Sequence, residues 1–543
     1  MPPRITLPPS RTALAVIAAV FILPGLAGHD LWKTQDAIAL GVVHGMAVSG
    51  DLVVPHLAGE RWLYDPPLYH WVALAFGKLL GSFIEFHSGA RLASGAFVGA
   101  AFMFIYRAAR RWSEPALSRT TACGAFILLL GCIGLLVHAH EALPELAGLT
   151  AMCGALSALS FAARRPAAAG ALCGLALGLA FLAAGWMAPL ALAAAVVLGH
   201  LVCAEWRTRR GAAFLLIAAI VALGVALTWP AVLAARAPEA FAEWRAIVLQ
   251  REGTVGANFR QFFATASWFT WPAWPLAAWT AWSLRAHWRE ARLFVPAVAV
   301  LLLAVLLIVW GPPADENLLP LLAPLSLFAA HGIFTLRRGA AAAFDWFAAL
   351  IFAFFAGGVW LGYLAMLTGV PGPVARNFAR IAPGYVTHAH VFAILFALLL
   401  AAAWVYVVFY TSFSPLRSVA RWAGGMVLLW GTFAALWMPW VDYQKSYRSV
   451  ALQLKSKLPV GASCLAERNV GVSQEAALDY HGGIRAQPYD VVKPAACPLV
   501  LVQGSPQHEL DAPAGAGLRW RKLADVGRPG DRSERYRLYR LER

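Results

Sequence analysis

The chain has 543 residues, of which 60% are hydrophobic and 13% charged, against roughly 45–50% and 25% in ordinary soluble proteins. With a mean hydropathy of +0.63, this composition excludes a soluble enzyme, a disordered chain, a fibre and the weakly hydropathic strands of an outer-membrane barrel. The net charge of +16 could indicate nucleic-acid binding, but the arginines lie in short groups between apolar stretches, and this distribution disfavours that function. We therefore expect an all-α polytopic membrane protein.

About thirteen apolar stretches are long enough to cross a bilayer, at about 20 residues per crossing. They lie near residues 12–28, 89–108, 119–138, 144–163, 167–184, 187–204, 212–234, 264–284, 292–310, 317–336, 344–367, 388–410 and 422–440. The first resembles a signal peptide, but the many later spans favour an uncleaved transmembrane helix.

Basic residues predict how these spans are oriented. Short arginine groups follow the even-numbered spans: Arg107, Arg110, Arg111, Arg164, Arg165, Arg207, Arg209, Arg210, Arg285, Arg289, Arg292, Arg337, Arg338, Arg417 and Arg421. By the positive-inside rule the N-terminus is cytoplasmic, and an odd number of crossings places the C-terminal segment in the periplasm of a bacterium. We expect a multi-pass protein of the inner membrane.

Two parts of the chain depart from the apolar pattern. The first external loop, residues 29–88, is rich in aromatic and charged residues, and helical spacing predicts amphipathic interfacial helices near 36–48 and 68–80. Residues 235–263 form a second external stretch. We predict a transmembrane domain over residues 1–440 that includes both.

Residues 441–543 are predicted to form a small periplasmic α/β domain. Helical patterns cover 446–458 and 473–480, and strand patterns cover 464–470, 498–503 and 535–541. Cys464 and Cys497 could form a disulfide if this domain is extracytoplasmic.

The most specific motifs lie in the first external loop. They read HDLWKTQD over residues 29–36, SGDLVVPHLAGE over 49–60 and RWLYDPPLYHW over 61–71. These segments resemble the GT-C glycosyltransferases that use polyprenyl-phosphate sugars, in particular the ArnT-like and protein-mannosyltransferase-like branch, which includes aminoarabinose transferases acting on lipid A. The resemblance continues through Ala90-Arg91-Leu92, His140-Glu141, Glu145, residues 181–185, residues 317–320 and the C-terminal domain.

This resemblance implies a GT-C fold and a transferase activity. A sugar would pass from undecaprenyl phosphate to a periplasmic acceptor, such as lipid A, another glycolipid or a protein hydroxyl, by an inverting displacement. The prenyl tail would lie between helices, and the sugar-phosphate head would lie in a cavity beneath the first loop.

The motif departs from the family pattern at three places. Gln35-Asp36 stands where the family has Asp-Glu, Tyr64-Asp65 stands where it has Glu-Lys, and Ala184 replaces a lysine. The usual base position is therefore an amide, and a cation for the donor phosphate is missing. These departures leave open a change of substrate or a loss of catalysis.

Such a transfer needs a carboxylate to deprotonate or orient the acceptor and positive charge to stabilise the departing phosphate. Asp36 is the first candidate for the catalytic carboxylate, and Glu145 is the second. The candidates for substrate binding are Lys33, Gln35, Arg61, Tyr64, Asp65, Tyr69, Arg251 and Arg260. A phosphate acceptor would need no strong base, and Asp36 would then only position groups.

Structural roles compete with each of these assignments. Asp36 and Asp65 could cap helices, and Arg251 and Arg260 could be ordinary surface charges. The residues His56, His70, His138, His140 and Glu141 match no metal-site spacing, so we assign no metal ligands and leave a divalent ion as an open alternative.

Two other functions compete with a transferase. A secondary transporter or flippase would show paired repeats and charged helices at mid-membrane, whereas the ionisable residues here concentrate at one face. A degenerate, non-catalytic GT-C relative is the other alternative, because positions 35 and 65 are altered.

Overall fold

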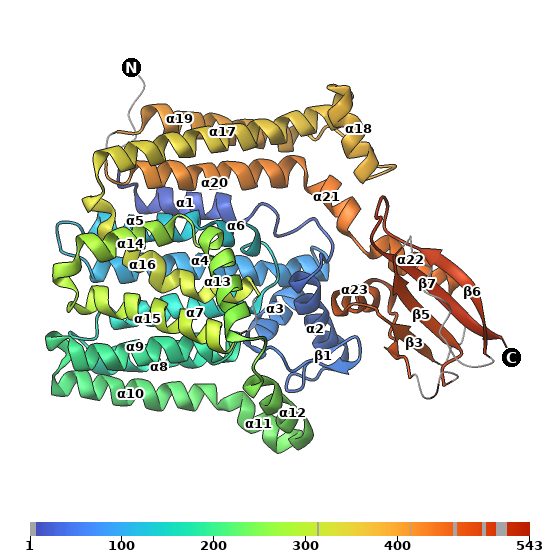
Figure 1. The fold of residues 1–543 in the computed structure, drawn as a ribbon, viewed down its shortest axis with the longest axis horizontal. Coiled ribbons are helices and arrows are strands. Elements are labelled where there is room, and N and C mark those ends of the chain that lie inside the picture. Colours follow the sequence, from blue (N-terminus) through green and yellow to red (C-terminus); the bar gives the residue numbers. More distant parts are fainter. Residues whose placement is uncertain are drawn as a thin grey trace.

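The computed structural model describes residues 7–311, 314–412, 414–459, 464–490, 493, 496–505 and 518–542. Long helices run side by side in a bundle, and a smaller part with a β-sheet lies at one end of it (Figure 1). The helices of the bundle are α1 (Arg11–Ile22), α4 (Phe86–Arg111), α5 (Ser118–Gly131), α6 (Ile133–His138), α7 (Pro144–Leu159), α8 (Pro166–Ala184), α9 (Met187–Val202), α10 (Arg209–Ala226), α13 (Val255–Phe269), α14 (Ala273–Ser283), α15 (Ala291–Val309), α16 (Leu322–Gly332), α17 (Arg338–Thr368), α19 (Val391–Tyr410) and α20 (Arg417–Leu436).

Shorter elements connect these helices. They are α2 (Gln35–Ser49), β1 (His56–Leu57), β2 (Glu60–Arg61), α3 (Leu68–Leu80), η1 (Ala204–Trp206), α11 (Thr228–Arg236), α12 (Pro238–Leu249), η2 (Arg285–His287), η3 (Glu316–Leu321), η4 (Ile333–Thr335), α18 (Gly372–Ile381) and α21 (Met438–Lys445), the η elements being 3-10 helices.

Eight helical segments of the described chain are long and apolar enough to cross a membrane. Shorter apolar helices of 10–17 residues include α1, α5, α7 and α9, and each coincides with a predicted span. The predicted span at 264–284 is divided between α13 and α14. Every predicted span therefore falls on helical structure, whereas the number of crossings and the orientation stay predictions.

Small residues set how closely some helices pack. Gly170, Gly174 and Gly178 of α8 face α10, and a Cβ on Gly174 would lie 2.4 Å from the carbonyl oxygen of Ala218. Without a hydrophobic driving force in lipid, such close backbone approach supplies the van der Waals contact that holds helices together.

The first loop, residues 29–88, packs between the bundle and the C-terminal part. The helix α2 is buried on most sides, from Asp36 to Met46. Gly41 approaches the Cβ of Ala476, and a Cβ on Gly45 would lie 2.1 Å from the carbonyl oxygen of His56. The predicted helices at 36–48 and 68–80 exist, but α2 is not a one-sided amphipathic helix, because the C-terminal part covers the face that the sequence alone leaves to solvent.

The C-terminal part contains the predicted α/β elements. They are α22 (Arg448–Lys457), β3 (Leu465–Arg468), α23 (Val472–Gly482), β4 (Gln487–Pro488), β5 (Leu499–Gly504), β6 (Arg519–Val526) and β7 (Arg535–Glu542). The sheet order is β4-β3-β5-β7-β6; β3 runs parallel to β4 and β5, and β7 runs antiparallel to β5 and β6. Cys464 and Cys497 form a disulfide, as the sequence allowed.

Buried polar contacts join the two parts. Asp30, in the first loop, accepts hydrogen bonds from Arg448 Nε at 3.0 Å and from Ser446 Oγ at 2.5 Å. Burial alone would raise the pKa of Asp30, but these hydrogen bonds lower it to about 2. Asp442 accepts from the backbone N–H of Asp30 and from the Trp32 indole, both at 2.8 Å. The loop that carries the motif is thereby fixed to the C-terminal part.

We expect Arg448→Ala to loosen this junction, because the buried carboxylate of Asp30 loses its charged partner. Hydrogen exchange in α22 and α23 should become faster, and Arg521→Ala, an exposed position on β6, should leave it unchanged. Since the folded-state pKa of Asp30 is depressed, its contribution is present above its ordinary value of 3.8 and is lost as the pH falls toward 2. Unchanged exchange in Arg448→Ala would contradict a role for this contact in docking.

Candidate functional site

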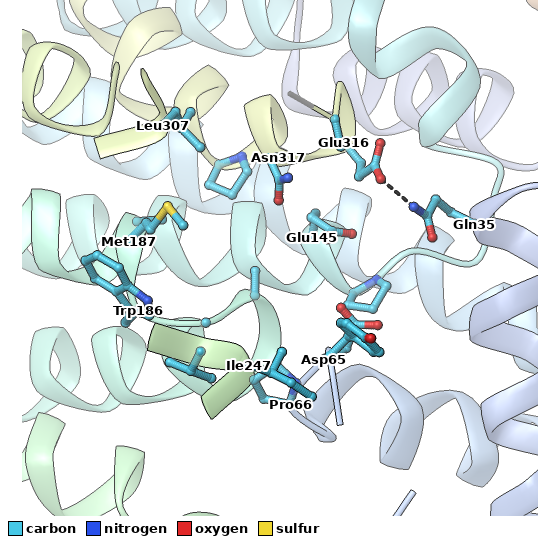
Figure 2. A pocket seen from close by; sticks show the side chains of 18 of the residues that line it. Gln35, Asp65, Pro66, Glu145, Trp186, Met187, Ile247, Leu307, Glu316 and Asn317 are labelled. Carbon is cyan, nitrogen blue, oxygen red and sulfur yellow. Dashed lines mark hydrogen bonds between the residues drawn. The ribbon is translucent and has the colours of Figure 1, made fainter. Parts of the chain in front are cut away.

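A cavity of about 390 Å³ lies where the first loop meets the ends of several bundle helices (Figure 2). Its wall is polar on one side and largely apolar on the other. The polar side chains are Gln35, Tyr64, Asp65, Glu145, Gln250, Glu252, Glu316 and Asn317, and the apolar ones include Trp186, Met187, Ile247, Leu303, Leu307 and Trp310.

Glu145 reaches the cavity from the first turn of α7. Pro144 occupies the first position of this helix, where it needs no N–H partner, and the helix dipole favours a carboxylate in the first turn. Glu145 is only 9% exposed, and no described residue donates a hydrogen bond to its Oε2. A buried carboxylate oxygen without a partner, facing a cavity, is expensive unless a ligand uses it.

Gln35 and Glu316 form a hydrogen-bonded pair across the cavity wall. The side-chain amide of Gln35, the first residue of α2, donates to Glu316 Oε1 at 2.5 Å (Figure 2). Glu316 begins η3 and is buried. The amide of Gln35 thus holds the Glu316 carboxylate in place, whereas an acidic residue at position 35 would repel it.

Asp65 lies below Glu145 in the same cavity (Figure 2). The indole of Trp62 donates to its Oδ2 at 3.0 Å, and the next residue, Pro66, also lines the cavity. Burial raises the pKa of Asp65, and the hydrogen bond from Trp62 offsets only part of this rise. Tyr64 is 59% exposed and packs its ring 4.8 Å from that of Trp62, which places it at the rim.

The cavity is acidic. Four carboxylates line it, and no lysine or arginine does so within the described ranges. Arg251 lies just outside: its Nε donates to the carbonyl of Val309 at 3.1 Å, and its guanidinium lies 5.8 Å from the ring centroid of Trp310, which lines the cavity. Arg251 is the predicted phosphate ligand that the fold brings beside the cavity, whereas Arg260 is exposed on α13 and does not line it.

Asp36, the first candidate for the catalytic carboxylate, lies outside the cavity. It is 1% exposed and forms a buried ion pair with Arg91 of α4, with Nε and Nη2 each at 2.9 Å. It also accepts from the backbone N–H groups of Trp32 and Ala142. Burial would raise the pKa of Asp36, but Arg91 and these hydrogen bonds hold it below its ordinary value. These contacts favour a positioning role over the predicted role as base.

Three predicted substrate-binding residues have other partners, and none of them lines the cavity. Lys33 forms an ion pair with Glu534 of the C-terminal part. Arg61 is exposed and pairs with Glu243 at 3.2 Å. Tyr69 is fully buried, and its hydroxyl is hydrogen-bonded to Ser94 at 2.8 Å. Their positions in the motif segments did not show whether these side chains line the cavity or form structural contacts.

The histidines considered for a metal do not gather into one site. His138 contacts Glu141 at 2.9 Å and Asp315 at 3.6 Å, and His140 is hydrogen-bonded to backbone carbonyls through both ring nitrogens.

Asp30, Glu85 and His87 are the one group in the described chain whose possible ligand atoms lie within 4.8 Å of one another. Arg448 already pairs with both of these carboxylates. The geometry therefore assigns no metal ligands.

Sequence reasoning missed several cavity residues. Glu316 is not among the predicted site residues, although it directly precedes the 317–320 segment that carries part of the resemblance. Glu252 and Trp186 lie in segments far from the first loop and have no local motif. Only the packing of η3, α12 and the α8–α9 turn around the loop brings them to the cavity.

We expect Asp36→Asn to lower the free energy of unfolding by roughly 3–5 kcal/mol, because it leaves the buried guanidinium of Arg91 without its counter-charge. Thermal and denaturant unfolding of the purified chain measure this change. Glu60→Gln, at an exposed position of the same loop, is the control. A variant with unchanged stability and abolished activity would instead support a catalytic role for Asp36.

Comparison with known proteins gives relatives of one kind. No protein-family model matches the sequence. The chain is 30% identical over 349 residues, 59% of either protein, to an undecaprenyl phosphate-α-4-amino-4-deoxy-L-arabinose arabinosyl transferase of Pseudomonas paraeruginosa. It is 28% identical over 234 residues to one from Pseudomonas fluorescens, a match covering 42% of this chain and 38% of the relative. The matches therefore span less than two thirds of these curated relatives.

The fold matches over nearly the whole chain. The crystal structure of ArnT from Cupriavidus metallidurans bound to undecaprenyl phosphate superposes with a TM-score of 0.67 at 19% identity, over 97% of both chains. Its apo form gives 0.66 at 18% identity. This chain is therefore similar in sequence to these arabinosyl transferases over part of its length, and it shares the fold of the ArnT structure over nearly all of it.

Proposed function

We propose that the chain is a membrane glycosyltransferase that moves a sugar from a polyprenyl phosphate, such as undecaprenyl phosphate, to a periplasmic acceptor. One observation carries this proposal: a cavity with carboxylates on one wall and apolar side chains on the other lies directly beneath the first-loop motif. A sugar needs polar partners, and a prenyl chain needs an apolar path. The relatives named for undecaprenyl phosphate support the donor class.

In the proposed reaction, the donor sugar lies beside Asp65, Glu145 and Glu316, and the first isoprene units contact Trp186, Met187 and Leu307. The acceptor oxygen attacks the anomeric carbon as the bond to the phosphate oxygen breaks. The acceptor proton passes to a carboxylate, and prenyl phosphate leaves with the bonding electron pair. We assign the base to Glu145, because its Oε2 has no other described partner.

The acidity of the cavity supports an amino sugar as the donor group. Four carboxylates without a lining cation suit a positively charged ligand better than a neutral hexose. The curated relatives are named for 4-amino-4-deoxy-L-arabinose, whose amine is protonated at neutral pH. Its ammonium would offset the carboxylates while Arg251, at the rim, contacts the phosphate.

We place the protein in the bacterial inner membrane, with its N-terminus in the cytoplasm and the C-terminal part in the periplasm. The arginine groups that follow even-numbered spans support this orientation. A glycolipid such as lipid A and a protein hydroxyl are both compatible with a cavity that opens beneath an external loop. Purified acceptors of the two classes, tested side by side, distinguish them.

The non-catalytic alternative has one observation in its favour. Gln35 and Ala184 line the cavity where the family pattern has a carboxylate and a lysine. Turnover of a labelled polyprenyl-phosphate sugar by the purified chain separates the two hypotheses, because a non-catalytic relative would bind the donor without transferring the sugar.

We expect Glu145→Gln to lower the rate of sugar transfer by about 100- to 10,000-fold, the range typical of a lost general base. The measurement is transfer from labelled donor to a membrane extract. Glu243→Gln, which alters an exposed ion pair outside the cavity, should retain the rate. Full activity in Glu145→Gln would exclude Glu145 as base and direct attention to Asp65.

The amino-sugar assignment predicts a clear preference between two donors. A polyprenyl-phosphate sugar bearing an amine should be transferred with a kcat/KM about 10-fold or more above its hydroxyl analogue, since an ion pair in a desolvated site contributes about 1.5–3 kcal/mol. Asp65→Asn should reduce this preference. Equal kcat/KM for the two donors would contradict the amino-sugar assignment and leave the transferase proposal intact.

A further inference from the structure

A second cavity, of about 820 Å³, lies at the end of the bundle away from the C-terminal part. It is formed by the start of α1, the end of α4, the start of α5 and the turn that follows α7. Its basic side chains are Arg11, Arg107, Arg110, Arg111 and Arg164. This cavity is separate from the acidic one beneath the first loop, which shares no lining residue with it.

The arginines of this cavity lack acidic partners. No aspartate or glutamate is among the described residues that line it, and within the described ranges no carboxylate pairs with any of its five arginines. Some other arginines are neutralised by carboxylates: Arg292 pairs with Glu114 and Glu290, and Arg417 and Arg421 pair with Asp345. The positive-inside rule accounts for arginines at this end, but it does not account for five unneutralised ones around a hollow.

The walls below the arginines are apolar. Leu14 and Ala18 of α1, Phe102 of α4 and Phe126 of α5 line the interior. On another side of α4 lies a second, almost wholly apolar groove of about 360 Å³, which includes Phe97, Phe104, Leu175 and Leu179. Both hollows share Arg107 and Arg111. The apolar wall of the cavity and the apolar groove therefore meet at the same two arginines.

We propose that this arginine-lined cavity binds an anionic phospholipid of the leaflet opposite the acidic cavity. The phosphate contacts Arg107, Arg110 and Arg111, and the two acyl chains follow the grooves on the two sides of α4. A basic pocket between membrane helices suits an anionic headgroup. Free phosphate could contact the same arginines, but it has no acyl chains to fill the apolar grooves.

The test measures lipid retention by the full chain. Purified protein in detergent is titrated with phosphatidylglycerol, with phosphatidylcholine or with inorganic phosphate, and bound lipids are counted by native mass spectrometry. We expect preferential retention of phosphatidylglycerol. The triple variant Arg107→Gln, Arg110→Gln, Arg111→Gln should weaken this retention by about 100-fold, since each arginine near an anionic headgroup contributes about 1 kcal/mol.

Two controls make the result specific. The triple variant Arg289→Gln, Arg337→Gln, Arg338→Gln loses the same charge in residues that do not line the cavity, and it should retain the lipid. Ala15→Trp fills the cavity from the exposed side of α1 without changing charge, and it should also weaken retention. Equal retention by all variants, equal retention of phosphatidylcholine, or displacement of the lipid by millimolar phosphate would each overturn the proposal.

Discussion

The buried ion pair between Asp36 and Arg91 organises the end of the bundle that carries the first loop. The guanidinium of Arg91 bonds both oxygens of Asp36 and also donates to backbone carbonyls of His29 and Asp30. Asp36 in turn accepts the backbone N–H of Ala142 at 2.8 Å. One pair thereby joins α2, α4, the chain after α1 and the turn before α7. Its contribution is chiefly positional, because the desolvation of two buried charges offsets much of their attraction.

The acidic cavity depends on this arrangement. Ala142 lies three residues before Glu145, and Asp36 directly follows Gln35, so the pair fixes both cavity residues through short stretches of backbone. The C-terminal part adds a second restraint through Asp30, which binds Arg448. Carboxylates gathered in a poorly hydrated cavity repel one another. Rigid positioning of the backbone is therefore needed to keep them together in the absence of a ligand.

Hydropathy was sufficient to predict the helices of the bundle, because long apolar stretches have no other stable conformation in lipid. Tertiary contact decided the rest. The burial of the α2 face that packs against Ala476 depends on a segment more than 400 residues away. The strand β6 was not predicted, because exposed residues such as Arg519 and Arg521 interrupt its apolar pattern. In the site, Glu145, Gln35, Tyr64 and Asp65 could be named from sequence, whereas Glu252 and Glu316 required the fold.

The position of Asp36 shows how different the surroundings of two neighbouring motif residues can be. Successive residues of an α-helix point about 100° apart, so Gln35 can face the cavity only while Asp36 faces Arg91. At position 35 this chain has an amide, which donates a hydrogen bond to Glu316, from η3, in the cavity. The carboxylates that remain, at positions 65, 145, 252 and 316, come from four separate segments. The chemistry of this site therefore depends on the packing of those segments rather than on the acidic pair that the family motif would supply.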